Sequence, residues 1–224
     1  MNCKEYHLPE LELATGQVRE ALQAIIHTIL FIRSPGPVAP NDVHCEGFNL
    51  TYTRIANDAV GSHPKKKNLY LDKKVDDSIE DFLKSLVQIG PELLSGCLTI
   101  SFFERRASKQ LFGLVSHEEK IIFEQWILHV VVNNTPRPVN DDSASKMERQ
   151  RIQDTAEAML RSVFMKVFQF ASGVEGGVSG DRSLDHIPPT LYEFEIRCTK
   201  KMDDRENVYS RVANMPALLN LDGS

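Results

Sequence analysis

The stretch Cys97-Leu-Thr-Ile-Ser-Phe-Phe-Glu104 alternates side chains, with Leu98, Ile100 and Phe102 facing one way, and Phe123 to Val132 repeats the pattern. Alternation with a period of two residues is typical of a strand with one buried face. Both runs are also rich in β-branched and aromatic residues, which suit a pleated, half-buried surface. We therefore predict two strands in the middle of a sheet whose apolar face is covered by helices.

The segment between these strands is predicted to be a long basic loop. It runs from Arg105 to Ile122 and carries Leu111 and Phe112 near its middle. Leaving such side chains in water forgoes about 1.5–3 kcal/mol of burial each, and exposed apolar anchors often serve as interface hot spots. The loop is therefore a candidate partner site, although Leu111 and Phe112 folded back onto the sheet remain an alternative.

Three segments have apolar residues at helical spacing. The first is Val18 to Leu30, the second is Asp72 to Ile89, and the third follows Ser145, which with Glu148 fits a capping box. Each segment has one apolar stripe, so each can cover part of the sheet.

Shorter alternating runs add further strands to this plan. They are Leu8 to Leu13, Phe48 to Thr53 and Tyr192 to Arg197, whereas Val38 to Glu46 and Asn57 to Asn68 are predicted to be loops. Strands whose residues alternate between apolar and polar favour an antiparallel sheet with one face exposed to solvent. They argue against a parallel sheet with helices on both faces. The predicted fold is α+β, a mostly antiparallel sheet with three helices packed on one face.

The composition favours a protein of the reducing cytoplasm that does not bind nucleic acid. The 224 residues are 42% hydrophobic and carry a net charge of -5, which is unsuited to neutralising phosphates. The four cysteines are scattered without a C-x-x-C pair, as expected for reduced thiols. We expect no signal peptide, and no apolar run approaches the roughly 20 residues of a membrane span.

The motifs of common catalytic sites are missing from the sequence. No phosphate-binding glycine loop occurs, and His117-Glu118 lacks the second histidine of a zinc helix. Ser179 lies one place off a nucleophile elbow, and the neighbours Asp185 and His186 point apart on an extended segment. We therefore predict a protein without enzymatic activity, cofactor or metal.

Several short motifs in order along the chain resemble one family. They are Met1-Asn2-Cys3, Ile26-His-Thr-Ile-Leu-Phe31, Phe48-x-Leu-Thr-Tyr52, Lys73-Lys-Val-Asp76, Leu98-x-Ile-Ser-Phe102-x-Glu104 and Phe123-Glu-Gln-Trp126. Together they resemble the autophagy-related protein 101 family, the small HORMA-domain subunits of the autophagy-initiation kinase complex. The resemblance reaches to about Cys198, and it rests on the order and spacing of the motifs.

The resemblance implies a HORMA-like fold and an adaptor function. Residues 1–198 would form a single domain and residues 199–224 a polar tail. Members pair with, and stabilise, a second HORMA-domain protein, the scaffold subunit of the same kinase complex. They also recruit downstream autophagy factors, so the expected location is the cytoplasm and the site of autophagosome assembly. A peptide-clasping HORMA protein of the checkpoint or meiotic type is the alternative.

The resemblance also implies a site in the loop between the two central strands. Family members carry an exposed Trp-Phe finger there, and the matching residues are Lys109, Gln110, Leu111 and Phe112. Phe112 matches the phenylalanine, whereas Leu111 stands where the family has tryptophan. This departure implies either a smaller pocket in the partner or the loss of recruitment through this loop.

Overall fold

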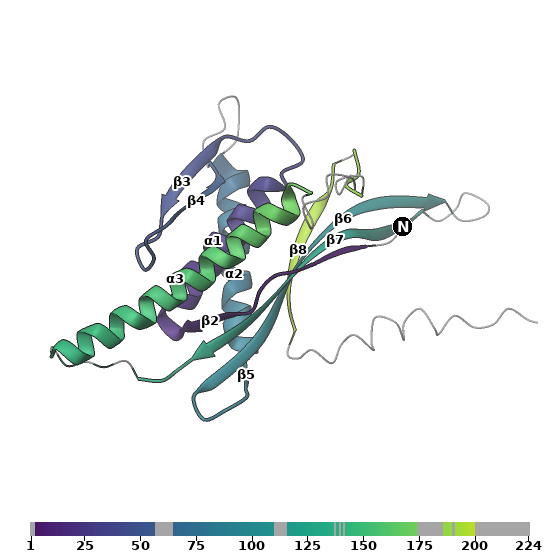
Figure 1. Ribbon diagram of the computed structural model, residues 1–224. Helices are drawn as coiled ribbons and strands as arrows, with labels where there is room; N and C mark the ends of the chain where they lie inside the picture. Colours follow the sequence, from purple (N-terminus) through teal and green to yellow (C-terminus); the bar gives the residue numbers. More distant parts are fainter. Residues whose placement is uncertain are drawn as a thin grey trace, which may run out of the picture.

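The computed structural model describes residues 3–56, 65–109, 116–136, 138, 140, 142–173, 186–189 and 191–199, without the side chains of 65–69, 107–109 and 116–117. A twisted sheet lies beside three helices, and a long hairpin leaves the sheet at one end (Figure 1). Within the described part of the chain, no helix combines the length and apolar character that crossing a membrane requires.

The main sheet is built around one long antiparallel hairpin. Its two strands pair from Leu93 opposite Asn133 to Lys109 opposite Ser116. Two further strands run antiparallel on the free side of the first hairpin strand, and two run parallel on the free side of the second. The six strands are β1 (Lys4–His7), β2 (Leu11–Ala14), β5 (Val87–Gln88), β6 (Leu93–Lys109), β7 (Ser116–Asn133) and β8 (Glu193–Thr199).

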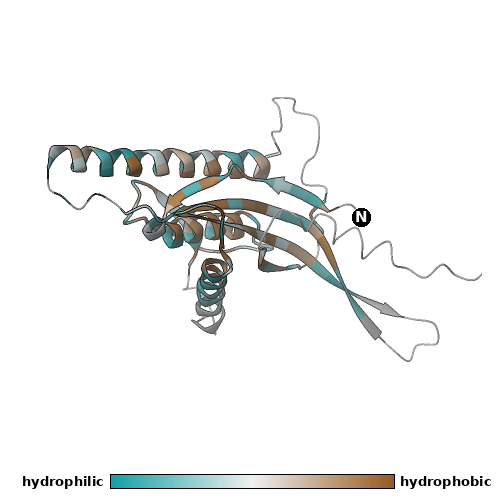
Figure 2. Cartoon of the chain, turned by 90° about the horizontal axis from the view of Figure 1, so that it is seen from below, coloured by the Kyte–Doolittle hydropathy of each residue, from teal (hydrophilic) through white to brown (hydrophobic). Residues whose placement is uncertain are grey.

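One face of this sheet forms the core with the helices α1 (Val18–Ile32), α2 (Lys65–Ser85) and α3 (Ser143–Ala171). Helix α2 packs on β6 and β8, α3 packs on β2, and α1 contacts both other helices. In Figure 2 the central strands are largely apolar, and the hairpin turns hydrophilic as it leaves the helices. The predicted α+β fold is confirmed. The buried apolar residues of these strands include Tyr6, Leu11, Leu13, Leu98, Ile100, Phe102, Trp126, Leu128, Val130 and Val132.

Several predicted boundaries are wrong. A two-stranded sheet of β3 (Pro40–His44) and β4 (Thr51–Ile55) replaces the loop predicted at 38–46 and the strand predicted from Phe48. Phe48 is nevertheless buried, because the turn between β3 and β4 inserts it into the core. Phe48 lies before β4 but continues its alternation of apolar and polar residues, and this alternation led to the prediction of a strand that starts at Phe48.

The helix ends also differ from the prediction. Helix α2 starts at Lys65, inside the predicted loop, and ends at Ser85, before the two residues of β5. The predicted capping box at α3 is wrong, because Asp142 is the N-cap and its side chain accepts the Ser145 N–H at 2.6 Å. The predicted domain boundary after Cys198 stays a prediction, since residues 200–224 lie outside the described residues.

Gly96 permits close contact between β6 and the end of α2. A Cβ atom at this position would lie 2.8 Å from Phe82 Cε2 and 3.0 Å from Leu86 Cδ2. The variant Gly96→Ala is therefore expected to lower the free energy of unfolding by about 1–3 kcal/mol, as overpacking does. Urea unfolding followed by circular dichroism measures this change. Gly36→Ala is the control, because its Cβ would meet nothing within 4 Å; equal stability of both variants would contradict the contact.

Candidate interaction site on the β6–β7 hairpin

The β6–β7 hairpin extends well beyond the rest of the sheet. The last residue of β6 that pairs with β8 is Phe103, opposite Glu193. The pairing of β6 with β7 continues to Lys109. Six residues at about 3.4 Å each carry the hairpin end roughly 20 Å past Phe103. The predicted loop from Arg105 to Ile122 is therefore mostly strand, and the segment left between the strands is residues 110–115.

Charged side chains support the base of this two-stranded extension. Arg105 and Lys120 lie opposite each other, which alone would be unfavourable for like charges. Arg105 Nε, however, lies 2.8 Å from Glu193 Oε1, and Lys120 forms an ion pair with Glu195. Lys120 Nζ also lies 4.0 Å from the centre of the Phe103 ring. These contacts stabilise a ribbon that would be marginal as an isolated hairpin.

A β-bulge marks the place where the hairpin leaves the sheet. Phe102 lies opposite Glu124, but Phe103 lies opposite Ile122, so Phe123 is an extra residue in β7. Bulges of this kind bend the strand and increase its twist. The bulge therefore lies at the junction between the sheet and the extended hairpin.

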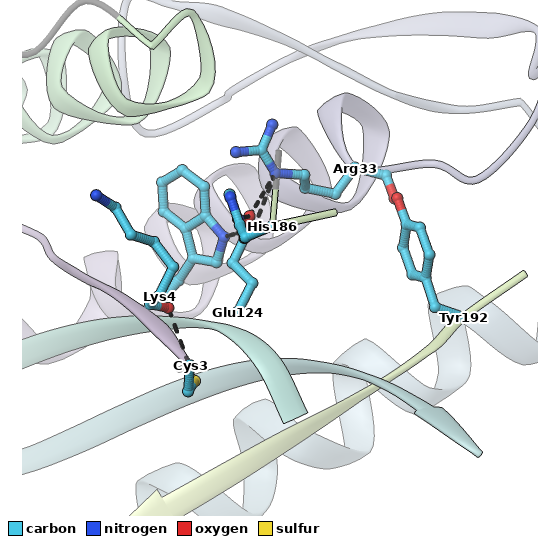
Figure 3. Close-up of polar contacts among 7 residues, drawn as sticks. Cys3, Lys4, Arg33, Glu124, His186 and Tyr192 are labelled. Carbon is cyan, nitrogen blue, oxygen red and sulfur yellow. Dashed lines mark hydrogen bonds and ion pairs between the residues drawn. The ribbon is translucent and has the colours of Figure 1, made fainter. Parts of the chain in front are cut away.

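Next to the bulge, the fully buried carboxylate of Glu124 accepts hydrogen bonds from three side chains (Figure 3). Arg33 Nε lies 2.8 Å from Oε1 and 3.1 Å from Oε2. Trp126 Nε1 donates to Oε1, and His186 Nε2 lies 2.6 Å from Oε2. Both carboxylate oxygens thus accept hydrogen bonds, which offsets part of the cost of burying the charge.

Electrostatics keep the Glu124 carboxylate ionised. Burial by itself raises the pKa of Glu124, but the hydrogen bond from His186 and the charge and hydrogen bonds of Arg33 outweigh it. The pKa therefore lies below its ordinary value. Glu124 is accordingly a charged structural anchor and not a proton-transfer group near neutral pH.

Of the predicted finger residues, the structure describes the backbone of Lys109 alone. Lys109 is the last residue of β6, and its backbone pairs with Ser116. Gln110, Leu111 and Phe112 lie outside the described residues. The finger assignment thus stays a prediction, whereas the structure describes β6 and β7, the strands on either side of residues 110–115.

Sequence reasoning missed the Glu124 cluster. In the sequence His186 stands beside Asp185, but in the structure its ring contacts Glu124. One sequence feature indicates this cluster. Glu124 is a charged residue on the strand face that otherwise carries apolar residues such as Trp126. A charged residue on a buried face requires a partner elsewhere in the chain.

A pocket of about 440 Å³ lies between β2 and α3. Its lining includes the apolar side chains of Leu13, Ile152 and Met159 and an ion pair of Arg151 Nη2 with Glu148 Oε1 at 2.7 Å. Arg151 holds the pKa of Glu148 below its ordinary value, which makes Glu148 a poor proton acceptor near neutral pH. Among the described side chains, no group of three or more His, Cys, Asp or Glu could hold a metal ion.

Comparisons with known proteins agree on one family. The model of the family "Autophagy-related protein 101" matches residues 10–191. The chain is 27% identical to "Autophagy-related protein 101" of Arabidopsis thaliana over 218 residues, covering 91% of this chain and 90% of the relative. It is 25% identical to the Homo sapiens protein of the same name over 216 residues, covering 89% and 90%. This chain therefore belongs to the autophagy-related protein 101 family.

Proposed function

We propose that this protein is a non-enzymatic adaptor of the autophagy-initiation kinase complex. It pairs with a second HORMA-domain scaffold subunit, stabilises that subunit, and recruits downstream autophagy factors through the loop at the end of the β6–β7 hairpin. It acts in the cytoplasm, at the site of autophagosome assembly. Membership of the autophagy-related protein 101 family supports an autophagy role.

The observation that carries the proposal is the extension of the β6–β7 hairpin. The pairing continues from Phe103 to Lys109, where β8 no longer contributes rungs. A chain that needed only to connect two strands would turn at the end of the sheet. The Lys109–Ser116 pair instead lies roughly 20 Å past the last β8 rung, which supports a loop that enters a pocket of another protein.

The outer face of α3 supports pairing with a second protein. Met165 and Phe168 lie one helical turn apart, and 69% and 52% of their surfaces are exposed. Large apolar side chains gathered on an exposed helix face are typical of a protein interface. We therefore assign the pairing with the scaffold subunit to this half of α3.

The pairing is tested by co-expressing the chain with the HORMA domain of the scaffold subunit from the same organism. Size-exclusion chromatography with light scattering is expected to give a one-to-one complex. Met165→Ser with Phe168→Ser should weaken the complex at least tenfold, because the exposed apolar anchors are lost. Met147→Ser is the matched control, since this residue is 71% exposed at the other end of α3.

Two outcomes would count against this proposal. If the unmodified chain forms no complex, and affinity purification from cells recovers neither scaffold nor kinase subunits, the adaptor function is wrong. If the double variant binds as well as the Met147→Ser control, the pairing surface lies elsewhere. The peptide-clasping alternative concerns the segment after α3, of which residues 200–224 lie outside the described residues.

A further inference from the structure

The direction of the hairpin depends on one short region of β7. On the sheet side of the bulge, β7 pairs with both β6 and β1, from Glu124 opposite Lys4 onward. On the hairpin side, β6 is the partner of β7 within the described residues. A bulge at such a junction sets the bend and twist of everything beyond it.

His186 contacts both the bulge residue Phe123 and its neighbour Glu124, and Tyr192 contacts Phe123 directly and Glu124 through Arg33. The extra residue Phe123 is buried, and its ring lies 5.1 Å from that of Tyr192 and 6.4 Å from that of His186, measured between ring centres. His186 also contacts Glu124, and Tyr192 donates a 2.8 Å hydrogen bond to the backbone carbonyl of Arg33. Arg33 in turn holds Glu124.

The anchors of this region lie outside the hairpin. Arg33 is the C-cap of α1, and its backbone N–H bonds to the carbonyl of Ile29. His186 and Tyr192 precede β8 in the chain. Figure 3 shows Arg33 and His186 meeting at Glu124, with Tyr192 reaching the backbone of Arg33. The bulge is thus fixed to a helix end and to the segment that leads into β8.

We propose that Arg33, Phe123, Glu124, His186 and Tyr192, here called the bulge clamp, aim the β6–β7 hairpin and thereby position its loop. The inference rests on the proposed function only in taking this loop as the binding element. With a lever of roughly 20 Å, a change of about 20° in the bend at the bulge moves the hairpin end by roughly 7 Å. His186 and Tyr192 are positioning residues, because they act through the bulge.

The test measures hairpin position without any partner. Spin labels attached to unnatural amino acids at Glu119 on the hairpin and Ser162 on α3, both exposed positions, report one distance in the full chain. His186→Ala removes the contacts with Glu124 and Phe123 and is expected to shift or broaden the distance distribution by about 3 Å or more, because Glu119 lies roughly 10 Å past the bulge. Tyr192→Phe removes only the bond to Arg33 and should broaden it less.

A control variant separates aiming from stability. Gln23→Ala removes the 2.7 Å hydrogen bond between Gln23 Nε2 and Asp76 Oδ1, which links α1 to α2 far from the bulge. It should lower the unfolding temperature while leaving the Glu119–Ser162 distance unchanged. If neither His186→Ala nor Gln23→Ala changes the Glu119–Ser162 distance, the bulge clamp does not aim the hairpin. If His186→Ala does not fold, Tyr192→Phe decides, and an unaltered distribution overturns the proposal.

Recruitment is measured separately on the same variants. A shifted distance together with weaker binding of downstream factors supports both the clamp and the proposed loop function. A shifted distance with unchanged binding leaves the aiming role intact but contradicts the role of the loop. Weaker binding without any shift in distance contradicts the aiming role alone.

Discussion

Replacing Arg33 with methionine is expected to lower the free energy of unfolding by about 3–5 kcal/mol, the range for breaking a buried ion pair. The Glu124 side chain is fully buried, and Arg33 is only 5% exposed. Methionine retains much of the packing volume but leaves the carboxylate with the donors Trp126 and His186 alone. Urea unfolding monitored by Trp126 fluorescence, the only tryptophan of the chain, measures the loss.

Two further variants identify the cause of this loss. Arg19→Met is the matched control on α1, because Arg19 and Glu80 form a half-exposed pair, for which we expect about 0–1 kcal/mol. Arg33→Met combined with Glu124→Gln removes the unpaired charge and keeps an acceptor for Trp126, so part of the stability should return. If the double variant is less stable than Arg33→Met alone, an isolated buried charge is not the cause.

Replacing Leu111 and Phe112 together with alanine is expected to weaken binding of downstream autophagy factors about 30-fold or more. This corresponds to about 2 kcal/mol, the threshold of an interface hot spot. Stability should change by no more than about 0.5 kcal/mol, as for surface substitutions. Isothermal titration calorimetry measures the binding, and urea unfolding measures the stability.

Glu119→Ala is the control on the same hairpin, because Glu119 is exposed and lies outside the predicted finger. It removes a polar side chain, so binding should change by less than about threefold, which is under 1 kcal/mol. Normal recruitment by the Leu111→Ala/Phe112→Ala double variant would show that the finger assignment is wrong for this chain. A loss of stability in that variant would instead mean that the two side chains fold back onto the sheet.

The limits of sequence reasoning are visible in the central hairpin. Leu98, Ile100 and Phe102 were placed correctly, because burial on one face imposes an alternating pattern. The pattern beyond Phe103 predicts a loop, because both faces of this extension carry charges such as Arg105, Arg106 and Glu118. A strand whose two faces are both polar has no alternation of apolar and polar residues in its sequence. The charged side chains of this extension form ion pairs with one another or with β8.

The start of α2 was missed for a related reason. The lysines at 65–67 have no apolar periodicity, so they were predicted to be part of a loop, yet the helix already includes them. Propensity and pattern are weak guides where a segment is polar throughout. The parallel pairing of β1 and β2 with β7 likewise follows from packing between distant segments, which no local pattern encodes.

The sequence by itself determined the α+β class, the inner faces of the central strands, the apolar stripes of the helices and the resemblance to the family. Each of these follows from contacts or motifs repeated at short spacing along the chain. Only the tertiary structure decided how far the hairpin extends, where it bends and what holds the bend. Glu124 meets Arg33 across 91 residues and His186 across 62, and such pairings exist only once the chain has folded.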